Sequence, residues 1–297
     1  MRVATYRYNG RRHVGRLTAD GKSVVPFELG EAAESRGALA LIERLVAGER
    51  LEPKGQAIAL SSLRLEAPIP QPRRNIFCVG KNYREHAQEF AKSGFDTSAG
   101  SGAIPDFPIV FSKVPECVTD PGAPIFIDPA ASEAIDYEAE LAVVIGRGGR
   151  GIRRERALDH VWGYTIVNDV TARDLQSRHK QWLIGKSQDS FCPMGPWLVS
   201  ADEIDLADTS VRCWVNDDLR QNSNTKALIF DVPTLIETIS KGLTLAPGDI
   251  IATGTPAGVG IGFNPPKYLR PGDVVRIEIA GIGVLENPVA RLAEAAA

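Results

Sequence analysis

The sequence predicts a strand-rich α+β protein with a β-sandwich or barrel-like core, not a doubly wound parallel sheet. From about residue 75 onward, runs rich in Val, Ile and Trp alternate with Gly-Asp or Pro-Gly turns. Only two convincing helical segments interrupt these runs, and many strands with few helices are not typical of alternating β-α-β units. The 297 residues, 43% of them hydrophobic, are enough for a sizeable core in one large domain or two unequal ones.

Residues 1–68 are predicted to form a small N-terminal domain, and residues 69–297 a larger catalytic domain. Residues 3–8 and 12–17 flank Asn9-Gly10, a pair that favours the tight turn of a β-hairpin. Residues 38–47 carry the apolar period of a helix. Three prolines then mark the boundary between the two domains: Pro68, Pro70 and Pro72.

The larger domain is predicted to contain several strands and two helices. The first helix covers about 173–182, and the second begins after the N-cap Asp231, has Pro233 in its first turn and ends at Gly242. The expected strands include 75–80, 140–145, 162–168, 211–215, 249–252 and 273–279.

Composition restricts the classes of partner. The net charge of −3 gives no electrostatic reason to expect nucleic acid or an anionic membrane surface. The four cysteines are scattered without a C-x-x-C pair, which indicates reduced thiols and neither a disulfide framework nor a zinc site. The N-terminus lacks the apolar segment of a signal peptide, and no window is apolar enough to span a bilayer. We therefore expect a cytoplasmic protein.

Three acidic residues form the most informative pattern. Glu138 and Glu140 are two apart in a buried-strand pattern, so they face the same side roughly 6.5–7 Å apart. Asp169 ends a second apolar run that a neighbouring strand would bring to the same place. Clustered carboxylates repel by roughly 4 kcal/mol per close pair, and oxygen ligands suit Mg²⁺, Mn²⁺ or Ca²⁺ better than Zn²⁺. The alternative is a solvated strand face whose glutamates pair with lysines.

A second pattern joins His86 to Glu89. If this segment is helical, the two side chains are i, i+3 neighbours, and a carboxylate on one ring nitrogen makes the imidazole a better general base. The alternative is an ordinary surface His–Glu pair. Residues 92–103 are Gly/Ser-rich and polar, which suits either a substrate-covering lid or a surface loop.

Two glycine-containing stretches offer backbone N–H groups for an oxyanion or carboxylate. Neither Gly185-Lys186-Ser187 nor the stretch 254–260 satisfies a nucleotide-binding fingerprint. Thr255 and the charge of Lys186 would add to anion binding at these places. Tight turns and a surface lysine are the structural alternatives.

Four blocks together resemble the fumarylacetoacetate hydrolase superfamily, in order from about residue 75 to 289: 136–146, 163–174, 186–196 and 249–260. The resemblance implies a mixed β-sandwich roll, a homodimer, and Mg²⁺ or Mn²⁺ on Glu138, Glu140 and Asp169. It also implies a catalytic dyad of His86 and Glu89 on a segment that orders when substrate closes the lid. Residues at the family's substrate-contact positions are Lys113, Arg173, Gln176, Lys186 and Thr255.

Members of this family hydrolyse C–C bonds of β-diketo acids, decarboxylate oxo acids or isomerise dienoic acids. We expect hydrolysis of an acylpyruvate-like, small anionic oxo acid, with His86 and Glu89 deprotonating water and Lys186 neutralising charge. The alternatives are decarboxylation of an oxaloacetate-type 2-oxo acid and isomerisation of a 2-hydroxy-dienedioate. A non-catalytic metal-binding protein is a fourth reading, which the presence of both dyad residues and all three carboxylates argues against.

Overall fold

A twelve-stranded mixed sheet forms the centre of the computed structural model, which describes residues 1–92 and 104–292. The strand order along the main path is β4-β3-β2-β1-β14-β12-β11-β17-β6-β7, with β5 on β1 and β8 on β14. The bounds are β1 (Arg2–Tyr8), β2 (Arg11–Leu17), β3 (Ser23–Pro26), β4 (Ile58–Ala59), β5 (Arg64–Glu66), β6 (Ile76–Gly80), β7 (Ile109–Lys113), β8 (Val118–Thr119), β11 (Ala139–Ile145), β12 (Val161–Asn168), β14 (Cys192–Ser200) and β17 (Ile250–Ala252).

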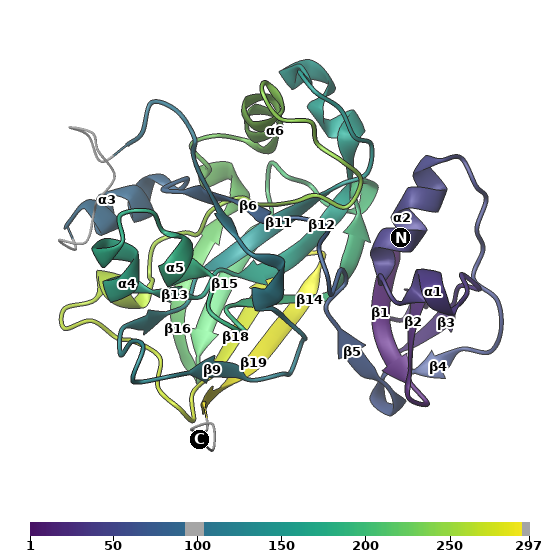
Figure 1. Ribbon diagram of the computed structural model, residues 1–297, viewed down its shortest axis with the longest axis horizontal. Helices are drawn as coiled ribbons and strands as arrows, with labels where there is room; N and C mark the ends of the chain where they lie inside the picture. The colour runs from purple at the N-terminus through teal and green to yellow at the C-terminus, as the bar shows by residue number, and fades with distance from the viewer. Residues whose placement is uncertain (93–103, 293–297) are drawn as a thin grey trace.

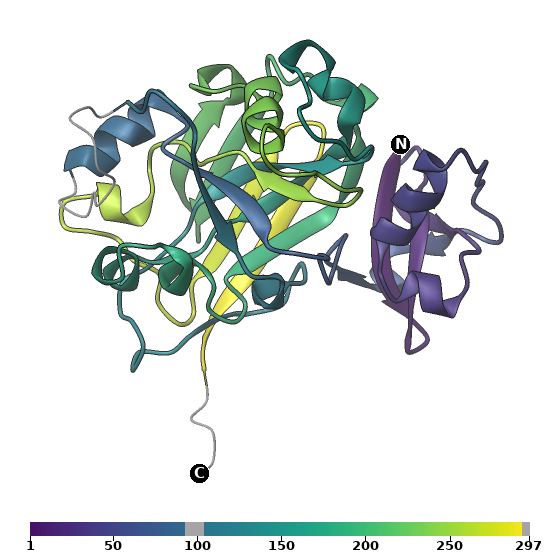
Figure 2. The ribbon, with the colours of Figure 1, turned by 45° about the horizontal axis from the view of Figure 1, so that its top comes forward.

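The N-terminal part forms a unit beside the larger body (Figures 1 and 2). It contains β1 to β5, the 3₁₀ turn η1 (Leu60–Ser62) and the helices α1 (Glu31–Glu34) and α2 (Ala38–Val46). The predicted hairpin is confirmed, because β1 pairs with β2 around Asn9 and Gly10, whose φ angles are 49° and 77°. β1 also pairs with β14, so the sheet continues from this unit into the larger body.

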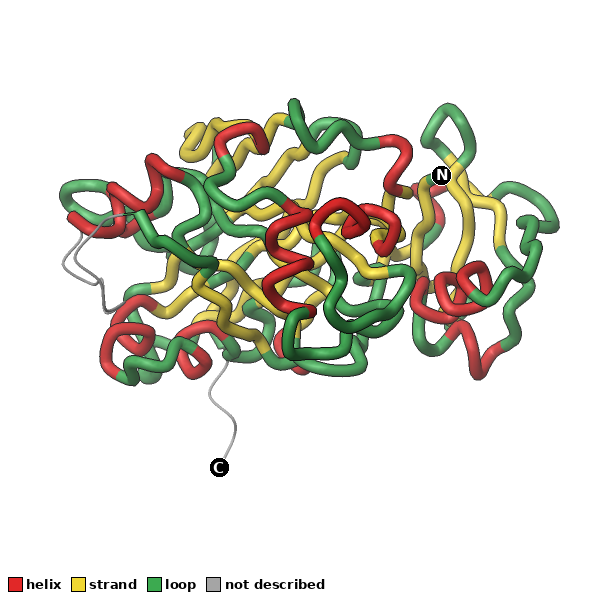
Figure 3. The backbone as a smooth tube through the Cα atoms, turned by 90° about the horizontal axis from the view of Figure 1, so that it is seen from above, coloured by secondary structure: helices red, strands yellow, loops and turns green. Residues whose placement is uncertain are grey.

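A second, five-stranded sheet completes the sandwich in the order β16-β15-β18-β19-β9. Its strands are β9 (Ile125–Ile127), β15 (Ser210–Val215), β16 (Asp218–Asn224), β18 (Val274–Ile279) and β19 (Gly283–Arg291), and a short ladder joins β10 (Ile135–Asp136) to β13 (Thr171–Ala172). Buried side chains of both sheets form one apolar core, for example Leu141 and Ile166 with Cys213 and Ile277. Figure 3 shows the strands inside and the helices around them. The strand-rich α+β prediction is confirmed.

The helices lie at the periphery. They are α3 (Arg84–Lys92), α4 (Arg173–Arg178), α5 (Leu183–Lys186) and α6 (Val232–Ser240), with 3₁₀ turns η2 (Pro115–Cys117), η3 (Arg154–His160), η4 (Ala201–Glu203), η5 (Thr225–Ala227) and η6 (Gly260–Gly262). The predicted cap of α6 is confirmed, because the Asp231 side chain accepts a hydrogen bond from the Thr234 N–H. The prediction of one helix over 173–182 is wrong. Lys180 has a φ of 61°, a left-handed conformation that a helix does not accommodate, and it lies between α4 and α5.

All four cysteines are buried free thiols, as expected. Among residues 1–92 and 104–292, no helix has the length and apolar content needed to cross a bilayer. Residues 93–103 of the predicted lid lie outside the described residues.

Candidate metal centre and active site

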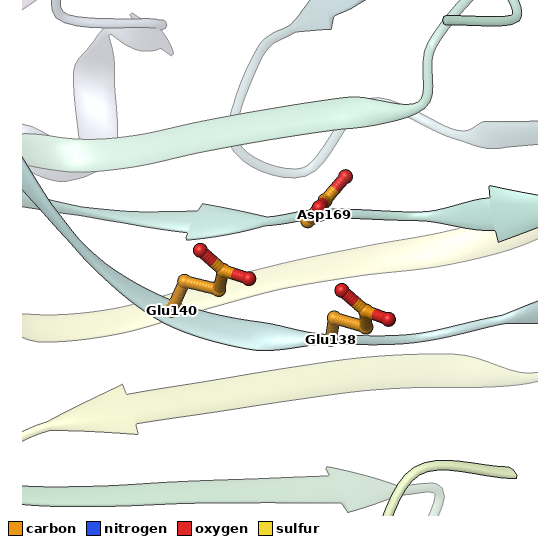
Figure 4. A group of neighbouring side chains, drawn as sticks. All are labelled: Glu138, Glu140 and Asp169. Carbon is orange, nitrogen blue, oxygen red and sulfur yellow. The ribbon is translucent and has the colours of Figure 1, made fainter. Parts of the chain in front are cut away.

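Pairing of β11 with β12 brings the three predicted ligands together. Ala139 lies opposite Asn168 in this antiparallel pair, so Glu138 and Asp169 extend side by side from the adjacent strand ends. The Asp169 N–H donates to the Glu138 carbonyl at 2.9 Å, and the Glu138 N–H donates to the Asn168 side chain at 3.0 Å. One oxygen from each of Glu138, Glu140 and Asp169 lies within 4.8 Å of the others (Figure 4).

The three carboxylates are buried, with exposed fractions of 4%, 1% and 0% for Glu138, Glu140 and Asp169. The alternative of a solvated strand face is therefore wrong. Lysines do pair with the cluster, but they are buried too. Lys186 Nζ lies 2.8 Å from Glu138 Oε2 and 2.7 Å from Asp169 Oδ2, and Lys113 Nζ lies 2.8 Å from Asp169 Oδ1.

The charged residues around the cluster shift the pKa values of Glu138 and Glu140 in opposite directions. Burial opposes ionisation of Glu138, but Lys186 and then Arg173, whose Nη1 is 2.7 Å from Glu138 Oε1, lower its pKa to about 2. Burial and the negative charges of Asp169 and Glu138 raise the pKa of Glu140 well above its ordinary value. Its carboxylate accepts a hydrogen bond from the Gly254 N–H at 2.8 Å. Without a cation, Glu140 is therefore the carboxylate that retains a proton most readily.

Two observations fit this site to a hard divalent cation. The donor set consists of carboxylate oxygens alone, which suits Mg²⁺ or Mn²⁺. Asp169 Oδ1 is buried and accepts no hydrogen bond from the described residues, because Lys113 Nζ, although 2.8 Å away, lacks hydrogen-bond geometry. The Lys113 ammonium compensates the charge of this oxygen, whose hydrogen-bonding capacity is otherwise unused, so Oδ1 can serve as a ligand atom. Glu138, Glu140 and Asp169 are the residues that would hold the cation.

The His–Glu pair lies on α3, at the edge of the same pocket. His86 Nδ1 is 3.2 Å from Glu89 Oε2, as the helical spacing predicted, and His86 is 5% exposed. Glu89, the other member of the pair, accepts a hydrogen bond from the Gly258 N–H through Oε1 at 3.0 Å. An ordinary surface pair is therefore the wrong description. His86, Glu138 and Glu140 line one pocket.

Most of the predicted substrate contacts face this pocket. Arg173, Gln176, Lys186 and Thr255 line it, and Thr255 Oγ1 accepts a hydrogen bond from Gln221 Nε2 at 2.8 Å. Lys113 does not line the pocket. It is 0% exposed, lies behind Asp169 and donates to backbone carbonyls.

Five pocket residues were not predicted from the sequence: Val79, Gly80, Lys81, Phe111 and Trp182. Lys81 follows β6 and has a φ of 55°, and a non-glycine residue in this conformation is often found at functional sites. Phe111 and Trp182 form an edge-to-face pair with ring centroids 5.0 Å apart. No sequence pattern links two aromatic residues so far apart in the chain.

The backbone N–H groups of the glycine-rich stretch after β17 donate to carboxylates of the protein itself, and binding of a ligand anion by this stretch stays a prediction. The N–H of Gly254 donates to Glu140, that of Gly258 to Glu89, and that of Gly260 to Asp136. One loop therefore contacts a candidate metal ligand, the candidate dyad and the first acidic residue of the Asp136-Tyr-Glu-Ala-Glu motif.

Comparison with known proteins identifies the family. The model of the fumarylacetoacetate (FAA) hydrolase C-terminal family matches residues 75–290, and the chain belongs to this family, as its motifs predicted. It is 53% identical over 233 residues to oxaloacetate tautomerase YisK of Bacillus subtilis, covering 78% of this chain and 74% of the relative. A fumarylacetoacetate hydrolase from psychrophilic Exiguobacterium antarcticum superposes with a TM-score of 0.83 and 40% identity, covering 98% of this chain and 100% of that one.

A third comparison concerns the metal centre. Maleylpyruvate hydrolase from Sphingobium sp. SYK-6, in a structure with manganese(II) and pyruvate, has a TM-score of 0.76 and 30% identity over 98% of this chain and 99% of that one. Family members thus include hydrolases and oxaloacetate tautomerases, and the chain is a member of an enzyme family.

Proposed function

We propose that the protein is a divalent-cation-dependent tautomerase that interconverts the enol and keto forms of oxaloacetate or a closely similar 2-oxo dicarboxylate. The observation that carries the proposal is that Glu138 and Glu140 of the carboxylate triad line one pocket together with His86 of the dyad. Such a pocket combines a cation site with a proton-transfer group. The tautomerase from Bacillus subtilis, 53% identical to this chain, supports oxaloacetate as the substrate.

Tautomerisation needs one proton removed and one proton added. The enol loses the proton of its C2 hydroxyl and gains one at C3, and no bond between carbon atoms breaks. A cation held by Glu138, Glu140 and Asp169 would polarise the C2 oxygen and stabilise negative charge on it. Glu89 contacts His86 at Nδ1, and we assign Nε2 as the ring nitrogen that accepts and returns the proton.

The cationic side chains of the pocket bind and orient the anion. Arg173 and Lys186 line the pocket, and Gln176 accepts a hydrogen bond from Arg173 Nη1 at 3.2 Å, which leaves its NH₂ group as a donor. Phe111 and Trp182 form an apolar wall that limits water beside the reacting atoms. These contacts favour a small, planar, multiply charged substrate.

C–C hydrolysis of an acylpyruvate-like acid, the reaction expected from the sequence, is the second candidate. The dyad geometry also suits removal of a proton from water, and the structurally similar maleylpyruvate hydrolase supports this reading. Tautomerisation is preferred because the tautomerase relative is 53% identical over 78% of this chain, whereas that hydrolase is 30% identical over 98% of it.

One assay panel separates these reactions. The purified protein, freed of metal by chelation and reloaded with Mg²⁺ or Mn²⁺, is mixed with the enol form of oxaloacetate, and its loss of ultraviolet absorbance is followed. Pyruvate release from oxaloacetate is measured in parallel to detect decarboxylation, and acylpyruvates and dienedioates are tested for hydrolysis and isomerisation. A cation-dependent acceleration of ketonisation without pyruvate release is expected. Turnover of acylpyruvates alone would replace the proposal with the hydrolase.

We propose three further properties of the whole molecule. The cation is Mg²⁺ or Mn²⁺, supported by the donor set, and metal analysis of the purified protein tests it. Family resemblance supports a homodimer, which light scattering tests, and the cytoplasmic location expected from the sequence is tested by cell fractionation. Residues 1–68 form a separate domain, and limited proteolysis near residue 68 tests this division.

A further inference from the structure

Asp136 is a buried acidic residue without a place in the mechanism described above. It is 0% exposed and accepts four hydrogen bonds. Oδ1 accepts from the N–H groups of Tyr137 at 2.8 Å and Gly260 at 2.6 Å, and Oδ2 accepts from Ile261 N–H at 3.0 Å and Arg173 Nε at 2.8 Å. Three backbone donors thus fix the carboxylate, and the fourth contact is the pocket arginine.

The glycine-rich loop is shaped for this arrangement. A Cβ atom at Gly260 would lie 2.7 Å from Asp136 Oδ1 and 2.4 Å from the Lys267 carbonyl oxygen. The close approach of the loop to Asp136 therefore requires glycine at 260. A carboxylate held by rigid backbone N–H groups is a fixed point against which a side chain can be oriented.

The contact to Nε determines the orientation of the Arg173 guanidinium. Nε is the guanidinium nitrogen nearest the aliphatic stem, so its hydrogen bond to Asp136 Oδ2 fixes the guanidinium plane and places Nη1 on the side away from that bond. Nη1 lies 2.7 Å from Glu138 Oε1 and 3.2 Å from Gln176 Oε1. Arg173 lines the pocket and is 1% exposed.

We propose that Asp136 is a positioning residue for substrate binding. Asp136 holds Arg173 at Nε, and this contact orients the guanidinium so that the outer nitrogens of Arg173 bind the substrate carboxylate while contacting Glu138. The inference rests on the proposed function for the identity of the substrate as a 2-oxo acid. Without the charge of Asp136, the guanidinium turns toward Glu138, a second carboxylate in contact with it. Arg173 then offers fewer donors to an anion in the pocket.

A binding effect of this kind has a defined kinetic signature. A carboxylate on the substrate is present in the ground state and in the transition state, so a loss of its contact raises KM and leaves kcat nearly unchanged. A charge-assisted hydrogen bond is equivalent to about tenfold or more in affinity. A purely structural role for Asp136 would lower the melting temperature without this separation of KM from kcat.

The test is a double-mutant cycle on the full-length protein with Mg²⁺, using D136N, R173M and the double variant D136N/R173M. Oxalate affinity is measured by calorimetry, and KM and kcat are measured for oxaloacetate ketonisation. D136N and R173M should each weaken oxalate binding and raise KM by about tenfold or more, with kcat within about threefold of wild type. Because Asp136 acts through Arg173, the double variant should match R173M.

Two results would overturn the proposal: unchanged oxalate affinity in D136N, or a double variant whose loss is the product of the two single losses. If one single variant does not fold, the double variant takes its place, because it removes both charges together. Its loss of oxalate affinity must then equal that of the single variant that folds, which is about tenfold relative to wild type. Oxalate binding needs no turnover. A wild type that binds oxalate but does not tautomerise oxaloacetate refutes the proposed function and leaves the test of Asp136 intact.

Discussion

Replacing Glu140 with Gln tests the metal centre with little change in side-chain shape. In the protein without a cation, burial and the charges of Asp169 and Glu138 raise the pKa of Glu140 and favour its neutral form. Gln is neutral at every pH and has nearly the same size. Glu140→Gln should therefore leave the stability of the cation-free protein unchanged or increase it, while removing one of the three charges that bind a divalent ion.

The magnitudes follow from the geometry. If Glu140 ionised without a cation, two charges 4.8 Å apart would repel by about 3.5 kcal/mol at an effective dielectric constant of 20, which is why its neutral form is favoured and why Gln matches it. A cation at one hundred times its dissociation constant stabilises the wild type by about 2.7 kcal/mol. With 297 residues and an unfolding entropy of roughly 2.1 cal/mol/K per residue, this stabilisation raises the melting temperature by about 4 °C. Glu140→Gln should lose most of that increase.

The same substitution changes the dependence on pH. Because the pKa of Glu140 is raised in the folded state, protonated Glu140 stabilises the cation-free fold, and this contribution is fully present below the unfolded pKa of about 4.3. The contribution is lost as the pH rises through the folded pKa. Cation binding has the opposite dependence, because Glu140 must release its proton to act as a ligand. Mg²⁺ affinity of the wild type should therefore increase with pH, with proton release on binding.

Differential scanning calorimetry with and without Mg²⁺, and titration calorimetry in buffers of different ionisation enthalpy, provide the measurements. Glu28→Gln is the matched control, because Glu28 is a glutamate with a side chain 73% exposed, outside the cluster. A Glu140→Gln variant that keeps the full Mg²⁺-dependent rise in melting temperature would refute the assignment of Glu140 as a ligand. A strongly destabilised cation-free variant would refute the reasoning about its neutral form.

Three further predictions concern neighbouring groups. Asp169→Asn should abolish cation binding. Unlike Glu140→Gln, it should also destabilise the cation-free protein by about 3–5 kcal/mol, because Lys113, which is 0% exposed, loses its charged partner. Denaturant unfolding measures this loss of stability. His86→Ala should lower kcat by roughly 10²–10⁴-fold with unchanged Mg²⁺ affinity, and wild-type kinetics would exclude His86 as the proton carrier. The amides of α3 should exchange hydrogen more slowly with Mg²⁺ and oxalate bound, and equal protection in both states would contradict closure of α3 over the substrate.

The triad was predictable because local rules determine its geometry. Glu138 and Glu140 are two apart on an extended segment, so period-two alternation alone places them on one face. The apolar run that ends before Asp169 indicates a second buried strand, and pairing of sequential strands is common. The i, i+3 spacing fixes the His86–Glu89 contact in the same way.

Contacts between distant segments were not predictable. Asp136 meets Gly260 and Ile261 across more than 120 residues, and no periodicity encodes that approach. Lys113 matched the family pattern for substrate contact, yet its side chain lies behind Asp169, because only the packing of β7 against the site decides where it points. The split between α4 and α5 depends on a left-handed residue, Lys180, whose side chain carries no strong signal for that conformation.

The charges around the pocket suggest an order of binding. Four carboxylates, Asp136, Glu138, Glu140 and Asp169, contact or adjoin three cationic side chains, Lys113, Arg173 and Lys186. With Glu140 protonated, the three negative charges of this cluster balance its three positive ones, and Lys81, which also lines the pocket, adds one positive charge. A divalent cation adds two charges and expels the Glu140 proton, which leaves the cluster with one net positive charge. Because the substrate is an anion, the cation should bind first, and oxalate affinity should depend strongly on Mg²⁺. Equal oxalate affinity with and without Mg²⁺ in calorimetry would contradict this order.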